Sequence, residues 1–593
     1  MRTVMFVNHK EKNCGVYQYG RIIGDILTKS QKYQFVYAEC SNNDDLKAKI
    51  QKYYPQAIIY NYHPSTLGWL SKVTKTINIP QIGMIHEITQ DVADRADKTL
   101  FDYHIAPDPT LLLRNPIVFK TGRPIPQYDN NVLPPTNLTI GSFGFGHKTK
   151  GFHKIVELVQ QEFDLALIRL QITTPHGNSI SGEQEYERIV NECKSKIYKK
   201  GITIETSNEF LEPQGLLDFL AGNTVNVFLY DDQQNRGLSS VIDYALAVRR
   251  TIAISNSSMF RHLFPANPSI CISHNSLSNI IANGIEPLKK YYSEWSNANL
   301  IWEYERIVDT VSRDFIPVKR RKLNIFERVI NKHYKARFGK RLIKVPKYAY
   351  KVSWNATSTY HAIEFNNQSG KMLQQYMPVK GINNFNIILD DVARRTYDVA
   401  VRLLGELCPD LIKRKMPRAN IQQGFVLDTV YRFAKELHNP KILCVGCYED
   451  TAAYALAKLG INFDAIDPMI NFNLQDFLDR PTTLKGHYDI IFSTSVIEHV
   501  DDDEQFVKDI AVLLNSNGVA VLTCDFQDTY KLGDEIPEVC ERFYTKYDLE
   551  NRLMNVMPYC KLIGKPNWDC DNYDFVFDKY RYTFATFVFR KAM

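Results

Sequence analysis

The stretch KILCVGCYEDTAAYALAKLGINFDAID, residues 441–467, predicts a strand, a tight turn, a helix and a second strand in succession. Residues 442–445 form a short apolar run that ends at Gly446, which opens the turn. Residues 451–459 are strong helix formers, and the strand after them ends at Asp467, 21 residues beyond Gly446. The pattern indicates the βαβ unit of a doubly wound α/β sheet.

Two residues of this unit suit a ligand that contains ribose. Gly446 lets the backbone approach a ligand closely, and the carboxylate of Asp467 can accept two ribose hydroxyl protons. Tyr448 and Asp450 stand where a GxGxxG loop has glycines, and Glu449 places negative charge at the helix N-terminus, which disfavours a pyrophosphate. The unit therefore favours S-adenosylmethionine, an adenosine that carries a cationic amino acid, over NAD.

The residues that follow extend this pattern. A buried strand is expected over 488–494, a helix over 501–514, a further strand over 519–524 and a closing hairpin near 576–590. ILCVGCYED, AIDP, DIIFSTSVIEHV and NGVAVLTC together resemble a class I S-adenosylmethionine-dependent methyltransferase. The resemblance implies that this cofactor is bound by Gly446, Glu449, Asp467 and Ser493.

Methyl transfer to a hydroxyl needs a base and good positioning. His499, at the end of SVIEH, is the candidate base, and Asp525 after the next strand is the alternative. A further interpretation is that Glu498 and His499 only shape the cofactor pocket.

Length and composition bound the remaining possibilities. At 593 residues the chain is long enough for about three or four domains. Hydrophobic residues at 44% and charged residues at 23% exclude disordered, collagenous and coiled-coil classes, and a net charge of +6 does not indicate a nucleic-acid partner. No apolar run is long enough for a signal peptide or a membrane span, so a cytoplasmic protein is expected.

The cysteines predict neither disulfides nor a metal site. There are 11 of them, an odd number without a framework spacing, which is typical of reduced thiols. Cys444 and Cys447 form the only CxxC pair, and without a second pair they are better explained as packed thiols.

The first half of the chain predicts two more doubly wound sheets. Strands and helices alternate over 2–123, and Gly15 in NCGVYQYG begins the first helix, where backbone N–H groups can face a ligand. A proline-marked stretch, 124–135, precedes a second such sheet. The loop GFGHKTKG, with Lys148 and Lys150, opens a helix of that sheet and is suited to a diphosphate.

A later segment, DDQQNRGLSSVIDYAL, adds Arg236, Ser239 and Asp243 to the candidate donor groups. Asp243 lies in a helix with apolar neighbours and can reach a ribose or sugar hydroxyl. The plainer alternatives are that Lys148 and Lys150 are solvated charges and that Asp243 binds a neighbouring turn.

Two Rossmann-like domains with a prolyl hinge resemble the GT-B glycosyltransferases, particularly the retaining family-four type, over about residues 1–312. The resemblance implies that Lys150 neutralises the diphosphate of a UDP- or GDP-linked sugar, with His147, Lys148 or Arg236 as possible substitutes for the family's missing charged residues. It also implies that Asp243 and the neighbouring Ser239 lie at the nucleotide and that Gly15 admits the transferred sugar. His86 in GMIHE is a catalytic-pocket residue on this view, or else a hydrogen-bonded strand-end histidine.

The predicted domains are a GT-B acceptor-side domain over 1–125, a GT-B nucleotide-sugar domain over 136–312, a basic and helical linker over 313–420 and a class I methyltransferase domain over 421–593. Residues 319–344 are strongly basic, which is typical of a solvated linker or of peripheral contact with an anionic membrane.

The predicted function is that of a bifunctional enzyme of polysaccharide biosynthesis. It would transfer a sugar from a nucleotide donor and methylate a sugar hydroxyl of a glycan or glycolipid acceptor. The alternative is an inactive GT-B sugar-binding module, or a nucleotide-sugar epimerase, attached to an active methyltransferase of small molecules or glycans.

Overall fold

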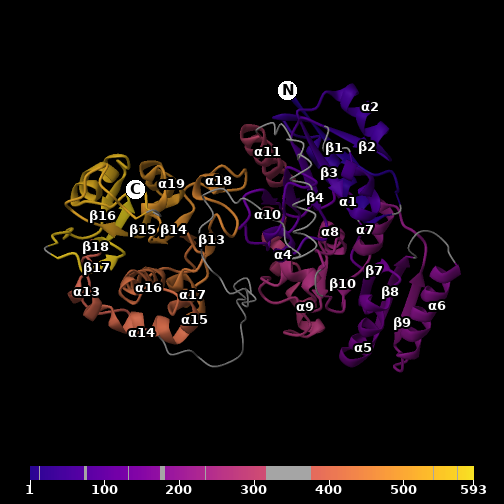
Figure 1. Cartoon of the computed structure of the whole chain (residues 1–593). Coiled ribbons are helices and arrows are strands. Elements are labelled where there is room, and N and C mark those ends of the chain that lie inside the picture. The colour runs from indigo at the N-terminus through magenta and orange to yellow at the C-terminus, as the bar shows by residue number, and fades with distance from the viewer. Residues whose placement is uncertain are drawn as a thin grey trace, which may run out of the picture.

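A computed structural model describes residues 1–12, 14–72, 77–130, 132–173, 180–233, 236–315, 376–537, 540–570 and 572–592. The basic segment 319–344, for which membrane contact was predicted, lies outside the described residues. The described parts contain three sheets, two in the N-terminal half and one in a C-terminal unit (Figure 1). The predicted α/β class is therefore confirmed.

The first sheet is parallel throughout, in the order β2-β1-β3-β4-β5-β6. Its strands are β1 (Arg2–Asn8), β2 (Tyr33–Glu39), β3 (Ala57–Tyr62), β4 (Gln81–Ile85), β5 (Tyr103–Ala106) and β6 (Val118–Lys120). Its helices are α1 (Gly15–Leu27), α2 (Asn43–Tyr53), α3 (Pro64–Leu67), η1 (Gly68–Lys72) and α4 (Gln90–Asp94). Its central strands β1, β3 and β4 are buried on both faces, as expected of a parallel sheet between helical layers.

The second sheet is also parallel, in the order β11-β10-β7-β8-β9. Its strands are β7 (Thr139–Phe145), β8 (Ala166–Thr173), β9 (Ile202–Ser207), β10 (Val225–Phe228) and β11 (Thr251–Ile254). Its helices are η3 (Lys148–Lys150), α5 (Phe152–Glu162), α6 (Ile180–Ser195), α7 (Pro213–Ala221), α8 (Val241–Ala247), η4 (Ser258–Leu263), α9 (Leu277–Asn283), η5 (Glu286–Leu288) and α10 (Lys289–Glu294).

A final helix of this half, α11 (Asn297–Asp314), returns to the first sheet (Figure 1). Leu300, Tyr304 and Ile307 of α11 are buried in the same core as β1 and β4. Two parallel sheets joined by a helix that crosses back to the first form the predicted GT-B arrangement.

The third sheet has the order β13-β12-β14-β15-β18-β16, with β17 paired to β18. Its strands are β12 (Ile442–Val445), β13 (Asp464–Ile466), β14 (Tyr488–Thr494), β15 (Leu514–Phe526), β16 (Cys560–Leu562), β17 (Phe575–Phe577) and β18 (Tyr580–Lys591). The first four are parallel, whereas β18 runs antiparallel to β15. The predicted closing hairpin is β17–β18.

Helices cover both faces of this third sheet. They are α13 (Asp391–Thr396), α14 (Asp398–Leu407), α15 (Pro409–Ile412), η6 (Pro417–Ala419), α16 (Asn420–Lys435), α17 (Thr451–Lys458), α18 (Leu474–Leu478), η7 (Ile497–His499), α19 (Asp503–Leu513), η8 (Asp548–Arg552) and α20 (Leu553–Asn555).

The predicted linker, 313–420, is too long. Asn386 donates a side-chain hydrogen bond to the Val588 carbonyl at 2.9 Å and accepts one from the Val588 N–H at 2.7 Å. Tyr397 packs edge-on against Phe425 of α16 at 5.4 Å. Residues 376–420 therefore belong to the C-terminal unit, because their apolar side chains complete its core.

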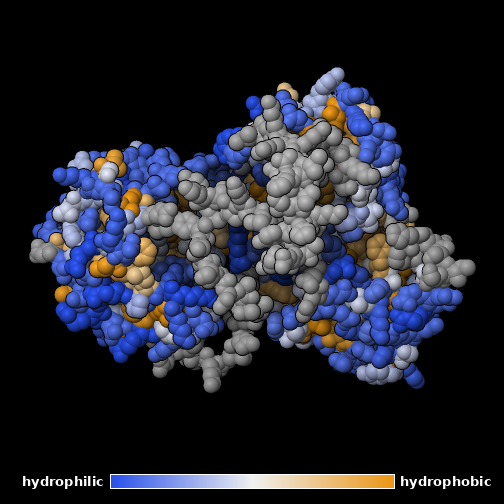
Figure 2. Space-filling view, viewed as in Figure 1, coloured by the Kyte–Doolittle hydropathy of each residue, from blue (hydrophilic) through white to orange (hydrophobic). Residues whose placement is uncertain are grey.

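The surface seen in Figure 2 is mostly hydrophilic, with hydrophobic residues scattered over both halves. In the part of the chain that the structure describes, no helix combines the length and the apolar character needed to cross a membrane.

Candidate functional site

A cavity of about 940 Å³ lies at the carboxyl ends of the parallel strands of the C-terminal unit. Gly446 follows β12, Asp467 follows β13, Ser495 follows β14 and Asp525 is near the end of β15, and all four line the cavity. Parallel α/β sheets bind ligands at this edge, because the loops there diverge and leave a crevice. The cavity has the size of a small-molecule site.

Gly446 has a backbone conformation that favours glycine. Its φ is +79°, and a Cβ atom there would lie 2.4 Å from Cγ2 of Val496. A side chain at this position would be strained and would collide with the opposite wall of the cavity.

Asp467 is 9% exposed and accepts hydrogen bonds from the backbone N–H groups of Tyr448 at 3.1 Å and Met469 at 2.7 Å. Burial raises the pKa of its carboxyl group, and the two N–H donors oppose that shift. A carboxylate can accept about four hydrogen bonds, so Asp467 retains acceptor capacity for ligand hydroxyls.

The charge of the cavity lining is mostly negative. Six aspartates line it against one lysine, Lys415. The aspartates are Asp450, Asp467, Asp501, Asp502, Asp509 and Asp525. The lining also includes the buried side chains of Asn420 and Gln422, whose carbonyl oxygens have no hydrogen-bond partner among the described residues. Such a cavity suits a ligand with cationic groups and N–H donors better than a phosphate.

Two of the predicted cofactor residues lie elsewhere. The carboxylate of Glu449 forms an ion pair with Arg414 at 3.2 Å and is not part of the cavity lining. Ser493 is 2% exposed inside the sheet, whereas the next two residues, Thr494 and Ser495, line the cavity. The strand β14 ends at Thr494, so the residues at and just beyond its carboxyl end reach the cavity, whereas Ser493 lies one residue too early.

The two candidate bases both line the cavity, and Asp525 has the more unusual surroundings. Burial raises the pKa of Asp525 well above its ordinary value, and the nearby carboxylate of Glu498 raises it further. Tyr582 is hydrogen-bonded to Asp525, and Glu498 accepts a 2.6 Å hydrogen bond from the Ser495 hydroxyl. A carboxyl group held near its neutral form is suited to taking up and releasing a proton.

His499 lies at the end of η7 and also lines the cavity. The structure thus brings both predicted bases to one site.

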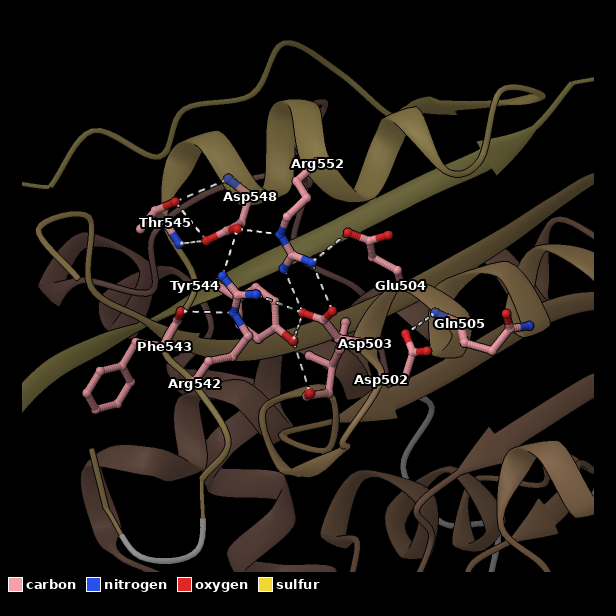
Figure 3. A network of polar contacts seen from close by, with 11 residues as sticks. Asp502, Asp503, Glu504, Gln505, Arg542, Phe543, Tyr544, Thr545, Asp548 and Arg552 are labelled. Carbon is pink, nitrogen blue, oxygen red and sulfur yellow. Dashed lines mark hydrogen bonds and ion pairs between the residues drawn. The ribbon is translucent and has the colours of Figure 1, made fainter. Parts of the chain in front are cut away.

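A polar network holds the wall beside these groups (Figure 3). Asp503 accepts hydrogen bonds from Arg552 at 2.6 and 2.9 Å and from the Tyr544 hydroxyl at 2.9 Å. That hydroxyl also lies 3.0 Å from the Ile497 carbonyl of η7. Asp548 accepts from Arg552 at 2.6 Å and from Arg542 at 2.8 Å. The network therefore ties residues 542–552 to the helix turn that carries Glu498 and His499.

In the N-terminal half, the predicted diphosphate groups meet between the two GT-B domains. Lys150 lies 3.8 Å from the ring centroid of Tyr230. Burial, together with the nearby charge of Arg236, lowers the pKa of Lys150 to about 8, and Glu87 opposes the shift. Arg236 forms an ion pair with Glu87 at 2.9 Å. A partly desolvated lysine close to an arginine attracts a dianion.

Asp243, predicted to lie at the nucleotide, forms an ion pair that the sequence did not predict. It is 1% exposed and forms a buried ion pair with Arg123, whose Nε lies 2.9 Å from Oδ1. Burial raises the pKa of Asp243 to about 6, and Arg123 opposes the shift. Because Arg123 belongs to the end of the first GT-B domain, its ion pair with Asp243 joins the two domains.

The other predicted residues of this half lie as follows. His86 is hydrogen-bonded to Oδ1 of Asn61 and packs edge-on against Tyr19, and burial lowers its pKa to about 3. Gly15 begins α1, and a Cβ there would meet open space. Ser239 is 7% exposed, and Lys148 lies in η3.

Sequence reasoning missed Arg123, Glu87 and Tyr230. Glu87 follows His86 directly, and Arg123 precedes the proline-marked stretch, but nothing local in the sequence shows that they pair with residues of the second domain.

Comparison with known proteins agrees with the geometry of the C-terminal cavity. Residues 416–564 match the family model described as a methyltransferase domain. This segment is therefore similar to methyltransferase domains.

Two curated relatives are similar to part of this domain. Both are ubiquinone biosynthesis O-methyltransferases, one from Rickettsia canadensis (strain McKiel) and one from Rickettsia typhi (strain ATCC VR-144 / Wilmington). The first is 26% identical over 120 residues, 17% of this chain and 50% of the relative, and the second is 24% identical over 119 residues, 18% of this chain and 48% of the relative. The chain thus spans about half the length of the curated relatives it matches.

The N-terminal half aligns with solved structures at low sequence identity. One is Anabaena HepE in complex with UDP-glucose, 10% identical, with 53% of this chain and 100% of that chain covered and a TM-score of 0.37. Another is the trehalose-6-phosphate synthase OtsA, 10% identical, with 54% and 100% covered and a TM-score of 0.38.

Proposed function

We propose that the C-terminal unit transfers a methyl group from S-adenosylmethionine to a hydroxyl group of an acceptor. The observation that carries this proposal is the acidic cavity that Gly446 and Asp467 both line from the ends of two adjacent strands. Asp467 would hold the ribose, and the carbonyl oxygens of Asn420 and Gln422 would accept from the ammonium group of the methionine moiety. The negative lining would favour the cationic cofactor.

When bound, S-adenosylmethionine supplies an electrophilic methyl group on a sulfonium sulfur. In its ionised form, Asp525 would take the proton that the acceptor hydroxyl releases as its oxygen bonds to the methyl group and the methyl–sulfur bond breaks. Burial and Glu498 keep the pKa of Asp525 raised, whereas the hydrogen bond with Tyr582 opposes that shift and orients the carboxyl group. His499, on the same wall, is the alternative base.

For the N-terminal half we propose transfer of a sugar from a UDP- or GDP-linked donor. Lys150 and Arg236 would neutralise the diphosphate, and Gly15 would leave room for the transferred sugar. The two activities together would make a methylated glycan or glycolipid, with the sugar added before the hydroxyl is methylated.

A second candidate for this half is a sugar-binding GT-B module without transferase activity. The buried Arg123–Asp243 pair favours it, because it leaves the helix α8 without a carboxylate for the ribose. A nucleotide-sugar epimerase remains the other alternative for the same fold.

One pair of assays on the full chain separates these proposals. Calorimetry with S-adenosylhomocysteine should show one site per chain, and incubation with UDP- and GDP-sugars plus glycan acceptors should release nucleoside diphosphate. Failure of the chain to bind S-adenosylhomocysteine would contradict the methyltransferase proposal. If the chain binds UDP or GDP but releases no nucleoside diphosphate from any sugar donor, the inactive sugar-binding module is favoured.

A further inference from the structure

The segment that follows Asp467 has two faces. Met469, Phe472 and Leu474 on this segment line the cavity. The segment contains only short regular elements, since β13 ends at Ile466 and α18 spans Leu474–Leu478. Its position must therefore depend on contacts made by its other face.

That other face rests on the N-terminal half. Arg306 of α11 forms an ion pair with Asp476 at 2.8 Å, and Trp302 packs against Phe472 with ring centroids 6.1 Å apart. Asn299 donates a hydrogen bond to the Thr482 hydroxyl at 2.7 Å. These three α11 residues form one stripe of the helix, because they are spaced three and four residues apart.

Met469 connects the cavity directly to the first GT-B domain. Its N–H donates to Oδ1 of Asp467 at 2.7 Å, and its carbonyl accepts from the N–H of Leu113 at 3.0 Å. The residue that orients the proposed ribose carboxylate is thus itself bonded to the other half of the chain.

The helix α11 is a firm support for this wall. Its opposite stripe, Leu300, Tyr304, Ile307, Val308 and Val311, is at most 1% exposed in the core of the first domain. In Figure 1, α11 and α10 lie on the side of the N-terminal half that faces α18 and β13.

We propose that the GT-B half forms part of the methyl-donor site, with Arg306 and Trp302 as positioning residues for the wall 467–476. This inference rests on the proposed binding of S-adenosylmethionine in the cavity. The helix α11 holds the back of Phe472 and Asp476, and the wall in turn holds Asp467 at the ribose. Loss of these contacts would leave the fold intact. The wall would then become ordered only on binding, which would weaken the affinity for the cofactor.

The test uses the full chain and S-adenosylhomocysteine as the ligand. The variants are Arg306→Gln, Asp476→Asn, their double variant and Trp302→Ala, with Arg313→Gln as the matched control. Arg313 lies on the same helix, but its side chain is 76% exposed and forms an ion pair with its neighbour Asp314 at 3.1 Å. Calorimetry gives Kd, and methyl-transfer kinetics separate KM for S-adenosylmethionine from kcat.

Loss of the Arg306–Asp476 ion pair or of the Trp302–Phe472 contact should raise Kd and the KM for S-adenosylmethionine about threefold to tenfold, with little change in kcat. Arg313→Gln should leave all three constants unchanged. The double variant should lose no more than either single variant, because both remove one ion pair. If a single variant proves unstable, the charge-exchanged variant Arg306→Asp with Asp476→Arg takes its place in the test. It restores an ion pair between the two positions and should recover much of the affinity.

Unchanged Kd in folded Arg306→Gln and Trp302→Ala would overturn the inference while the wild-type chain still binds the ligand. Failure of the wild-type chain to bind it would overturn the methyltransferase proposal as well, so the two failures are distinguishable.

Discussion

Asp467 is the residue on which the cofactor proposal depends most directly. Two backbone N–H groups hold its carboxylate at the end of β13, with acceptor capacity left toward the cavity. Asp467→Ala should weaken binding of S-adenosylmethionine by about 1.5 to 3 kcal/mol, the value of a hydrogen bond to a charged group.

Calorimetry on Asp467→Ala and on Asp464→Ala checks this expectation. Asp464 lies on the same strand, bonds the Tyr488 hydroxyl and does not line the cavity, so its variant should bind normally. Equal affinity in the wild-type chain and Asp467→Ala would remove the ribose assignment.

Asp525 makes a prediction about pH. Burial and Glu498 raise the pKa of Asp525 in the folded chain. The folded state therefore binds this proton more tightly than the unfolded state, and its contribution to stability is lost as the pH rises above the ordinary carboxyl value. Asp525→Asn should thus become increasingly stable relative to wild type as the pH rises above the ordinary carboxyl pKa of about 4.

The same variant should bind S-adenosylhomocysteine normally and lose most methyl transfer, because the base acts on the acceptor. Thermal unfolding at several pH values measures the first effect, and product formation measures the second. Full methyl transfer by Asp525→Asn would move the role of base to His499, and His499→Asn is then the deciding variant.

At the scale of elements, the network of Figure 3 holds η8 and the strand-end loop against η7. Burial disfavours the charge of Asp503, but the hydrogen bonds and charge of Arg552 hold its pKa below the ordinary value. Its contribution to stability is therefore present at neutral pH and is lost in acid.

Asp503→Asn should lower the free energy of unfolding by about 2 to 3 kcal/mol, because it leaves two largely buried arginines short of a partner. Glu504→Gln is the matched control. The carboxylate of Glu504 is more exposed and makes a single 3.2 Å contact with Arg552, so its loss should cost less than about 1 kcal/mol. Urea denaturation measures the free energy of unfolding of both variants. Similar losses in the two would show that Asp503 contributes no more to stability than Glu504.

At the scale of the whole molecule, the two proposed chemistries lie in separate places. Lys150 lies between the GT-B domains, whereas the methyl-donor cavity lies in the C-terminal unit. Lys150→Ala should abolish nucleoside diphosphate release, because a buried cation is lost from the diphosphate, and should leave methylation of a preformed glycan unchanged.

Both activities are measured on one preparation of Lys150→Ala, with Lys148→Ala as a control for the adjacent lysine. A parallel fall of the two activities in a folded Lys150→Ala chain would show that the sites are not independent. Nucleotide binding by the wild-type chain should also weaken above about pH 8, where Lys150 loses its charge.

The sequence alone determined the elements and much of the C-terminal site. Apolar periodicity set β12, α17 and β14, and Gly446 and Asp467 could be placed because parallel strands end at the same edge of a sheet. Local chemistry at a strand end is visible in the residues themselves.

Only the tertiary structure decided which side chains pair across the domains. Asp243 forms an ion pair with Arg123, 120 residues away, and Asp476 forms one with Arg306, 170 residues away. Whether a buried carboxylate serves a ligand or an arginine depends on how the domains dock, because the ion pair forms only where docking excludes water from both charges. The same docking places α11 behind the cofactor wall, which no periodicity within either segment could show.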